Sequence, residues 1–88
     1  MLTDKQALKN LATNLAALLK ERGWQQVELA RRIMQEGETV DAASMRVSRY
    51  IRGAHMPSGA TLANIAEALS VTIDWLLANH KGRGKRAG

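Results

Sequence analysis

Apolar residues recur along this chain at intervals of three and four positions, the spacing that lines one face of an α-helix. The clearest run contains Leu8, Leu11, Leu15, Leu18 and Leu19. No stretch alternates apolar and polar residues with β-branched enrichment, and no Asn-Gly hairpin turn occurs. The sequence therefore predicts an all-α fold whose helices bury their apolar stripes against one another.

Capping residues and helix breakers divide this pattern into five helices with short connections. Thr3, with Gln6 three positions later, forms a capping-box pattern, and Gly23 is a typical left-handed helix stop. Pro57 cannot continue a helix and marks a connector. The first expected helix covers about residues 4–22, and the second runs from residue 25 or 26 to residue 35 or 36 and ends on Gly37. The third covers about residues 42–52, with Thr39 or Asp41 as its cap and Gly53 as its stop. The fourth is capped by Ser58, and a short fifth helix is capped by Thr72.

The size of the chain sets its domain organisation. Eighty-eight residues, 45% of them apolar, suffice for one hydrophobic core. We expect one domain at residues 1–80. After His80 the composition changes to Lys-Gly-Arg-Gly-Lys-Arg-Ala-Gly, so residues 81–88 are expected to be a flexible basic tail. Such a tail could lie along phosphates or enter a minor groove, or it could be a solubilising end or the start of a linker to a further domain.

Several classes of protein are disfavoured. Cysteine is absent, which removes disulfides and thiolate zinc sites. The N-terminus lacks the layout of a signal peptide, and no apolar run approaches the ~18 residues of a membrane span. We therefore expect a cytoplasmic protein without membrane contact. His55 and His80 have no acid–histidine–nucleophile spacing, so no enzyme activity is expected. The acids Glu36, Glu38 and Asp41 lack the ligand spacing of a calcium site, and no cofactor or metal is expected.

Charge is segregated along the chain. The net charge is +5, but four of the 13 cations lie within residues 81–88, which leaves nine cations against eight acids in the rest. Residues 42–66 contain no Asp or Glu and carry Arg46, Arg49 and Arg52 at helical spacing. This segregation favours a nucleic-acid partner over an ordinary solvated surface with accidental clustering.

Three segments carry a family resemblance. QVELA at 26–30, VSRYIRG at 47–53 and PSGATLANIAEALSVTIDWLL at 57–77 together resemble the Cro/C1-type (lambda-repressor-like, XRE-type) helix-turn-helix family over roughly residues 8–78. The resemblance implies a compact five-helix DNA-binding domain. Its signature is the order and spacing of Gly53, Pro57, Leu62, Ala66, Leu69, Val71 and Leu76.

One departure from the family pattern lies before the third helix. Between Ala30 and Ser48 the chain is about seven residues longer than the family's second helix and tight turn. We expect a longer second helix followed by a loop. Counting backward from Gly53 is then the safer way to place the third helix.

By that count, the resemblance places Ser44, Met45 and Arg49 where the family's recognition helix reads bases. Arg49 is the best candidate for a guanine, because its planar fork matches the two acceptors on that base. Met45 suits a thymine methyl group, and Ser44 suits a base or a phosphate. Arg46 falls where it can reach either base edges or the backbone.

Three further residues are candidates for contact with the DNA backbone. Gln26, at the start of the second helix, resembles the family's backbone-anchoring glutamine. Arg52 and His55, near the connector, are weaker phosphate candidates.

Each assignment has a structural alternative. Arg52 could pair with a glutamate of the first or second helix, and Arg46 with Asp41 or Glu38. Met45 could pack under the long loop.

A homodimer is expected, since one recognition helix reads only a few base pairs. Ile73, Leu76 and Leu77 suffice to close the core, which leaves Trp75 to face outward as a dimer contact. The alternative is that Trp75 caps the core beside the first or fourth helix.

The sequence thus predicts a sequence-specific DNA-binding transcriptional regulator, of the phage- or plasmid-type repressor kind, that binds a palindromic operator in double-stranded DNA as a homodimer. The main alternative is an antitoxin-like protein-interaction module that binds a toxin partner through its acidic loop, Glu36 to Asp41, and autoregulates its promoter. A second is an accessory DNA-binding protein with little sequence preference.

Overall fold

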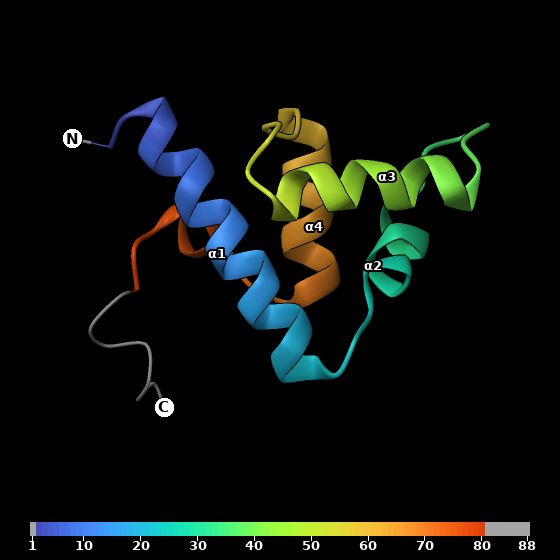
Figure 1. The fold of residues 1–88 in the computed structure, drawn as a ribbon, viewed down its shortest axis with the longest axis horizontal. Helices are drawn as coiled ribbons and strands as arrows, with labels where there is room; N and C mark the ends of the chain where they lie inside the picture. Colours follow the sequence, from blue (N-terminus) through green and yellow to red (C-terminus); the bar gives the residue numbers. More distant parts are fainter. Residues whose placement is uncertain (1, 81–88) are drawn as a thin grey trace.

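The computed structural model describes residues 2–80, which form five helices and no strand (Figure 1). The predicted all-α class is confirmed for this part of the chain. Residues 81–88, where the basic tail was expected, lie outside the described residues. The helices are α1 (Asp4–Arg22), α2 (Gln26–Ile33), α3 (Val40–Ile51), α4 (Gly59–Leu69) and α5 (Ile73–Leu77).

The first helix begins and ends where the sequence predicted. Thr3 and Gln6 form a complete capping box, in which each side chain accepts a hydrogen bond from the other residue's backbone N–H. Gly23 adopts the left-handed conformation (φ 71°), and its N–H bonds to the carbonyls of Leu19 and Lys20 in the last turn of the helix. The helix buries the stripe formed by Leu11, Leu15, Leu18 and Leu19.

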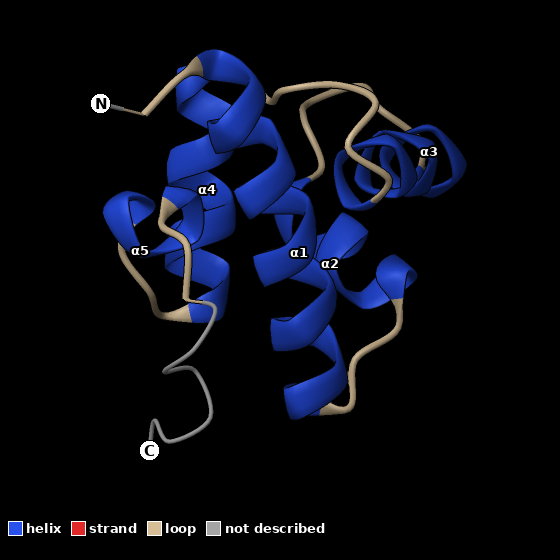
Figure 2. Cartoon of the chain, turned by 60° about the vertical axis from the view of Figure 1, so that its left-hand side comes forward, coloured by secondary structure: helices blue, strands red, loops and turns tan. Residues whose placement is uncertain are grey.

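A single core joins all five helices. α2 packs on α3 and α4, while α1 packs on α3 and α5. In Figure 2, α5 and α3 lie on opposite sides of the molecule. The largest fully buried side chains are Leu11, Leu15, Leu29, Val47, Ile65, Leu69 and Leu76.

The region between α2 and α3 differs from the prediction. α2 ends at Ile33 instead of reaching Gln35 or Glu36, because Met34 turns to an extended conformation (φ −57°, ψ 139°). Gly37, with φ 82°, therefore lies inside a loop and ends no helix. This loop comprises residues 34–39 and includes a turn in which the Glu38 N–H bonds to the Gln35 carbonyl.

The third helix starts earlier than expected. It begins at Val40, and Thr39 caps it by accepting a hydrogen bond from the Ala42 N–H at 3.1 Å. Its last residue is Ile51, and Gly53 follows with φ 72°. A Cβ atom at Gly53 would lie 3.6 Å from Ala12 Cβ, so this turn also brings the end of α3 close to α1.

The caps predicted for the last two helices are confirmed. Ser58 accepts from the Thr61 N–H, and Thr72 accepts from the Trp75 N–H. No helix among residues 2–80 is long and apolar enough to cross a membrane.

Candidate nucleic-acid interface

Helix α3 has one buried and one exposed face. Ala43, Val47 and Tyr50 point into the core. The opposite side carries the exposed residues Ala42, Met45, Arg49 and Arg52, spaced by three, four and three positions, which we name the α3 outer stripe.

The two arginines of the α3 outer stripe meet no carboxylate among residues 2–80. Within this part of the chain, the Arg49 side chain forms no hydrogen bond or ion pair, so its guanidinium is available to a ligand. Among the same residues, the Arg52 side chain donates one hydrogen bond, from Nε to the Ser48 carbonyl one turn earlier, at 3.3 Å. The alternative in which Arg52 pairs with a glutamate of the first or second helix is therefore wrong for the described residues.

Charge changes sign along this exposed side of α3. Its first turn carries the exposed Asp41, and the neighbouring loop carries the exposed Glu36. Its last turns carry Arg49 and Arg52. A polyanion would therefore be held mainly at the C-terminal half of α3.

Met45 and Ser44 differ in how much they are exposed. Met45 is 57% exposed, so the alternative in which it packs under the loop is wrong. Ser44, beside it, is half-buried. Of the two, only Met45 offers most of its surface to a partner.

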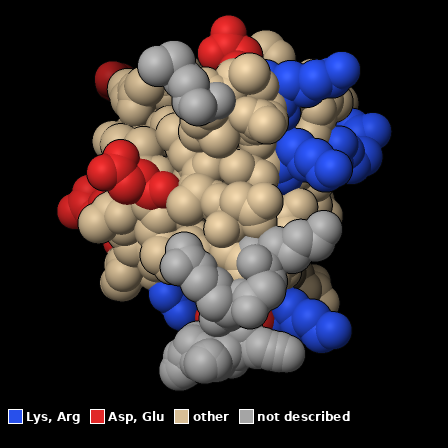
Figure 3. Space-filling model, turned by 90° about the vertical axis from the view of Figure 1, so that its left-hand side faces the viewer, with Lys and Arg blue, Asp and Glu red and all other residues tan. Residues whose placement is uncertain are grey.

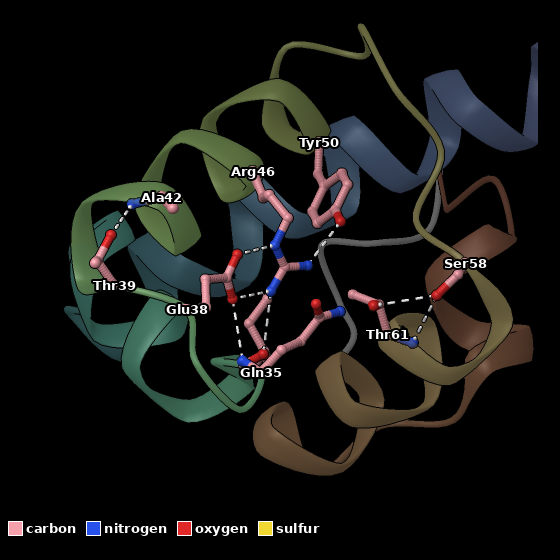
Figure 4. Close-up of polar contacts among 9 residues, drawn as sticks. Gln35, Glu38, Thr39, Ala42, Arg46, Tyr50, Ser58 and Thr61 are labelled. Carbon is pink, nitrogen blue, oxygen red and sulfur yellow. Dashed lines mark hydrogen bonds and ion pairs between the residues drawn. The ribbon is translucent and has the colours of Figure 1, made fainter.

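Arg46, by contrast, points toward α2 and the loop and is held there (Figure 4). Its Nε and a terminal nitrogen bond to the two carboxylate oxygens of Glu38 at 2.7 and 2.9 Å. The same guanidinium donates to the Ile33 carbonyl at the end of α2 (3.2 Å) and to the Tyr50 hydroxyl (3.0 Å). The structure thus favours the alternative in which Arg46 pairs with Glu38 over contact with DNA.

The ion pair shifts the protonation equilibria of both partners. Hydrogen bonds from Arg46, and one from the Gln35 backbone N–H, hold the pKa of Glu38 below its ordinary value of 4.5. The hydrogen bonds to Glu38 raise the pKa of Arg46 further above its already high value, against the opposing effect of partial burial. Both groups are therefore charged at neutral pH and lock the loop onto α3.

Gln26 and His55, the candidate contacts with the DNA backbone that lie outside the α3 outer stripe, are both exposed. Gln26 is the first residue of α2. The N-cap residue, Gln25, makes no side-chain hydrogen bond to the first N–H groups of that helix. His55 lies in the connector after α3, with its ring 6.3 Å from the ring of Tyr50 and roughly parallel to it.

Trp75 is more buried than the outward-facing position that the sequence predicted. It is half-buried and packs against the core, and its ring stacks on His80 with centroids 4.0 Å apart. This placement favours the alternative in which Trp75 caps the core, although one side of the residue lines a groove beside α1.

Two structural residues had not been singled out from the sequence. Asn14 is buried, and its amide donates to the carbonyls of Leu76 (2.7 Å) and Ala78 (2.9 Å) and, at 3.3 Å, to that of Trp75. Asn10 donates to the Leu77 carbonyl at 2.9 Å. An asparagine inside the apolar stripe of α1 was the available signal, because a buried amide needs partners.

No group of three or more His, Asp or Glu side chains within residues 2–80 could hold a metal ion.

Comparison with known proteins adds one finding. The family model described as the SP15 N-terminal domain matches residues 15–79, which include α2 to α5 and the C-terminal part of α1. Neither the curated proteins nor the solved structures gave a significant match.

Proposed function

We propose that this chain, which belongs to the SP15 N-terminal domain family, is a sequence-specific DNA-binding transcriptional regulator that uses α2 and α3 as a helix-turn-helix. The observation that carries the proposal is the α3 outer stripe. One face of this helix is fixed in the core, while the other presents Arg49 and Arg52 without a carboxylate partner among residues 2–80. Two arginines in this position suit phosphates and guanine edges.

The residues of the stripe divide between reading and anchoring. The Arg49 guanidinium has no side-chain or backbone partner among residues 2–80 and is our choice for a guanine, with Met45 beside it for a thymine methyl group. Arg52, closer to the end of the helix, serves a phosphate. Gln26 and His55 are proposed as further backbone contacts, and Ser44 as a minor contact, because it is half-buried.

Arg46 is proposed as a positioning residue and not as a base reader. Its hydrogen bonds tie α3 to the end of α2 and to the loop, so the orientation of the α3 outer stripe depends on it. The lengthened segment between the two helices thereby becomes a fixed part of the helix-turn-helix.

A repressor that occupies a palindromic operator as a homodimer is the form of this function that we favour, since a single helix reads too few base pairs for useful selectivity. The antitoxin-like alternative has less support, because Glu38, one of the acids in the proposed partner-binding loop, is engaged with Arg46. Glu36 and Asp41 remain exposed for such a partner.

The deciding experiment compares binding to random DNA and to DNA from the chain's own upstream region, by fluorescence anisotropy at low and raised salt. A sequence-specific regulator keeps a preference for the upstream DNA at raised salt, where non-specific binding falls steeply. Equal binding to both DNAs would favour the accessory DNA-binding alternative. No binding to either, together with co-purification of a small basic protein, would favour the antitoxin-like module.

A further inference from the structure

A groove of about 670 Å³ runs between α1 and the end of α5. Its floor contains the buried Asn14 and Leu18, and one wall is formed by Trp75 and His80. In Figure 2 α5 lies on the side of the molecule opposite α3, so the groove is separate from the α3 outer stripe.

Contacts within the chain hold the Trp75 and His80 wall of the groove in place. The buried Asn14 amide fixes the C-terminal carbonyls of α5, and His80 Nε2 lies 2.9 Å from the Trp75 carbonyl. The stacked rings of Trp75 and His80 therefore form a rigid aromatic surface. Binding to a preformed surface avoids much of the ordering cost of association.

The α1 side of the groove carries opposite charges toward its two ends. Lys9 lies in the first half of the helix and Glu21 in its last turn, with Thr13 and Ala17 between them. All four side chains are exposed, and neither charged group forms an ion pair within the described residues. On the face in Figure 3, uncharged side chains fill the middle, and charged ones lie toward the edges.

Because one end of this face is positive and the other negative, two copies of it are complementary in charge when they lie antiparallel. In an antiparallel pair of α1 helices related by a two-fold axis between Thr13 and Ala17, Lys9 of each copy meets Glu21 of the other. Twelve positions separate the two residues, about 18 Å along a helix, so both ion pairs form together at the two ends of the contact. The small central side chains let the helix axes approach closely.

We propose that this groove is the homodimer interface, with the second copy seated antiparallel along α1 and Trp75 as the aromatic anchor at its edge. The charge pattern favours this occupant, because a partner of a single charge sign would be repelled at one end of the groove. The proposal gives Trp75 an interface role that is compatible with its half-buried position. It deepens the homodimer of the proposed function, but its test requires no DNA.

The test is a charge swap on the full chain, followed by sedimentation equilibrium at low salt. Lys9→Glu and Glu21→Lys each replace two attractive pairs with two repulsive ones, and we expect each to weaken dimerisation about tenfold or more. An equimolar mixture of the two variants should recover dimerisation, since each supplies the charge that the other needs. The double variant Lys9→Glu/Glu21→Lys should also recover it.

Ala17→Arg is the second variant, because it fills the centre of the contact from an exposed position and should leave thermal unfolding unchanged. We expect it to be monomeric. A monomeric wild-type chain, or a dimer that is insensitive to the single reversals and to Ala17→Arg, would overturn the proposal. None of these variants touches the α3 outer stripe, so a failed interface leaves DNA binding testable and failed DNA binding leaves the interface testable.

Discussion

Arg46 and Glu38 face each other in a two-point ion pair, with Nε–Oε2 and terminal nitrogen–Oε1 distances of 2.7 and 2.9 Å. The pair connects the middle of α3 to the loop of residues 34–39 (Figure 4). Because the same guanidinium also caps the Ile33 carbonyl, one side chain closes the loop at both ends. The loop of residues 34–39 is thereby tied to α3.

Replacing Arg46 should destabilise the fold. Arg46→Met removes four hydrogen bonds, and we expect the free energy of unfolding in urea to fall by about 1–3 kcal/mol. Arg46→Lys should recover only part of this loss, because an ammonium cannot make the planar two-point contact. Arg49→Met is the matched control, and its change should stay within about 0.5 kcal/mol. Equal unfolding energies for the wild type and Arg46→Met would contradict the locking role.

The same pair should make stability depend on pH. The folded chain holds the pKa of Glu38 below its ordinary value of 4.5, so this group binds fewer protons when folded than when unfolded. Its contribution is therefore complete above about pH 4.5 and is lost as the pH falls through the lower folded value. Urea midpoints measured from pH 7 to pH 3 should fall more steeply for the wild type than for Glu38→Gln. Glu36→Gln, from the same loop, should keep the wild-type slope.

Much of the fold follows from local signals in the sequence. The capping box at Thr3, the left-handed stop at Gly23 and the serine and threonine caps of α4 and α5 depend on neighbours within a few positions. Such contacts are encoded locally, so single-sequence reasoning finds them.

The loop between α2 and α3 could not be placed in this way. Its conformation depends on Arg46, which lies eight positions after Glu38. The Arg46 guanidinium donates hydrogen bonds to both the Ile33 carbonyl and the Glu38 carboxylate. The sequence pattern offered both Asp41 and Glu38 as partners. Only the packed geometry of α2 against α3 distinguishes them, which is also why the end of α2 was predicted two to three residues too late.

The candidate functional residues also differ in how far they could be predicted from the sequence. The family resemblance places Arg49 and Met45 among the base-reading positions of the third helix, and both side chains are exposed on α3. The groove beside α5 depends instead on Asn14, whose partners lie more than sixty positions away. Contacts of that range carry no local signature.

Asn14 should be among the most sensitive positions of the fold. Asn14→Ala leaves the carbonyls of Leu76 and Ala78 without their donor in a buried region, and we expect a loss of about 2–3 kcal/mol in unfolding free energy. Asn14→Asp should cost more at neutral pH, because it places a negative charge in a buried position that faces carbonyl oxygens. Asn10→Ala, which removes one half-buried hydrogen bond, should cost about 0.5–1.5 kcal/mol. A smaller loss for Asn14→Ala than for Asn10→Ala would show that the amide does not hold α5.

Ser70 offers a route to a more stable chain. It ends α4 in the left-handed conformation (φ 58°), which costs a residue with a Cβ atom about 1–2 kcal/mol. Ser70→Gly removes this cost but adds about 0.5–1 kcal/mol of unfolded-state entropy. The net expectation is a gain of about 0.5 kcal/mol in thermal or urea unfolding. Ala63→Gly, at an exposed interior position of the same helix, should instead lose about 1 kcal/mol.

Arg49 and Arg52 should affect DNA binding in different ways. Arg49→Ala should weaken binding by about 1–3 kcal/mol and relax the preference at one base position, because its guanidinium has no partner within the described part of the chain and can reach a base edge. Arg52→Ala should weaken binding to all sequences alike and reduce the salt slope by about one, as expected for a phosphate contact. Lys20→Ala, an exposed cation on α1, serves as the control and should leave sequence preference unchanged. Selected-sequence binding measured for the three variants at two salt concentrations separates these outcomes. If Arg49→Ala keeps full affinity and an unchanged sequence preference, Arg49 does not read a base, and the α3 outer stripe loses its claim to specificity.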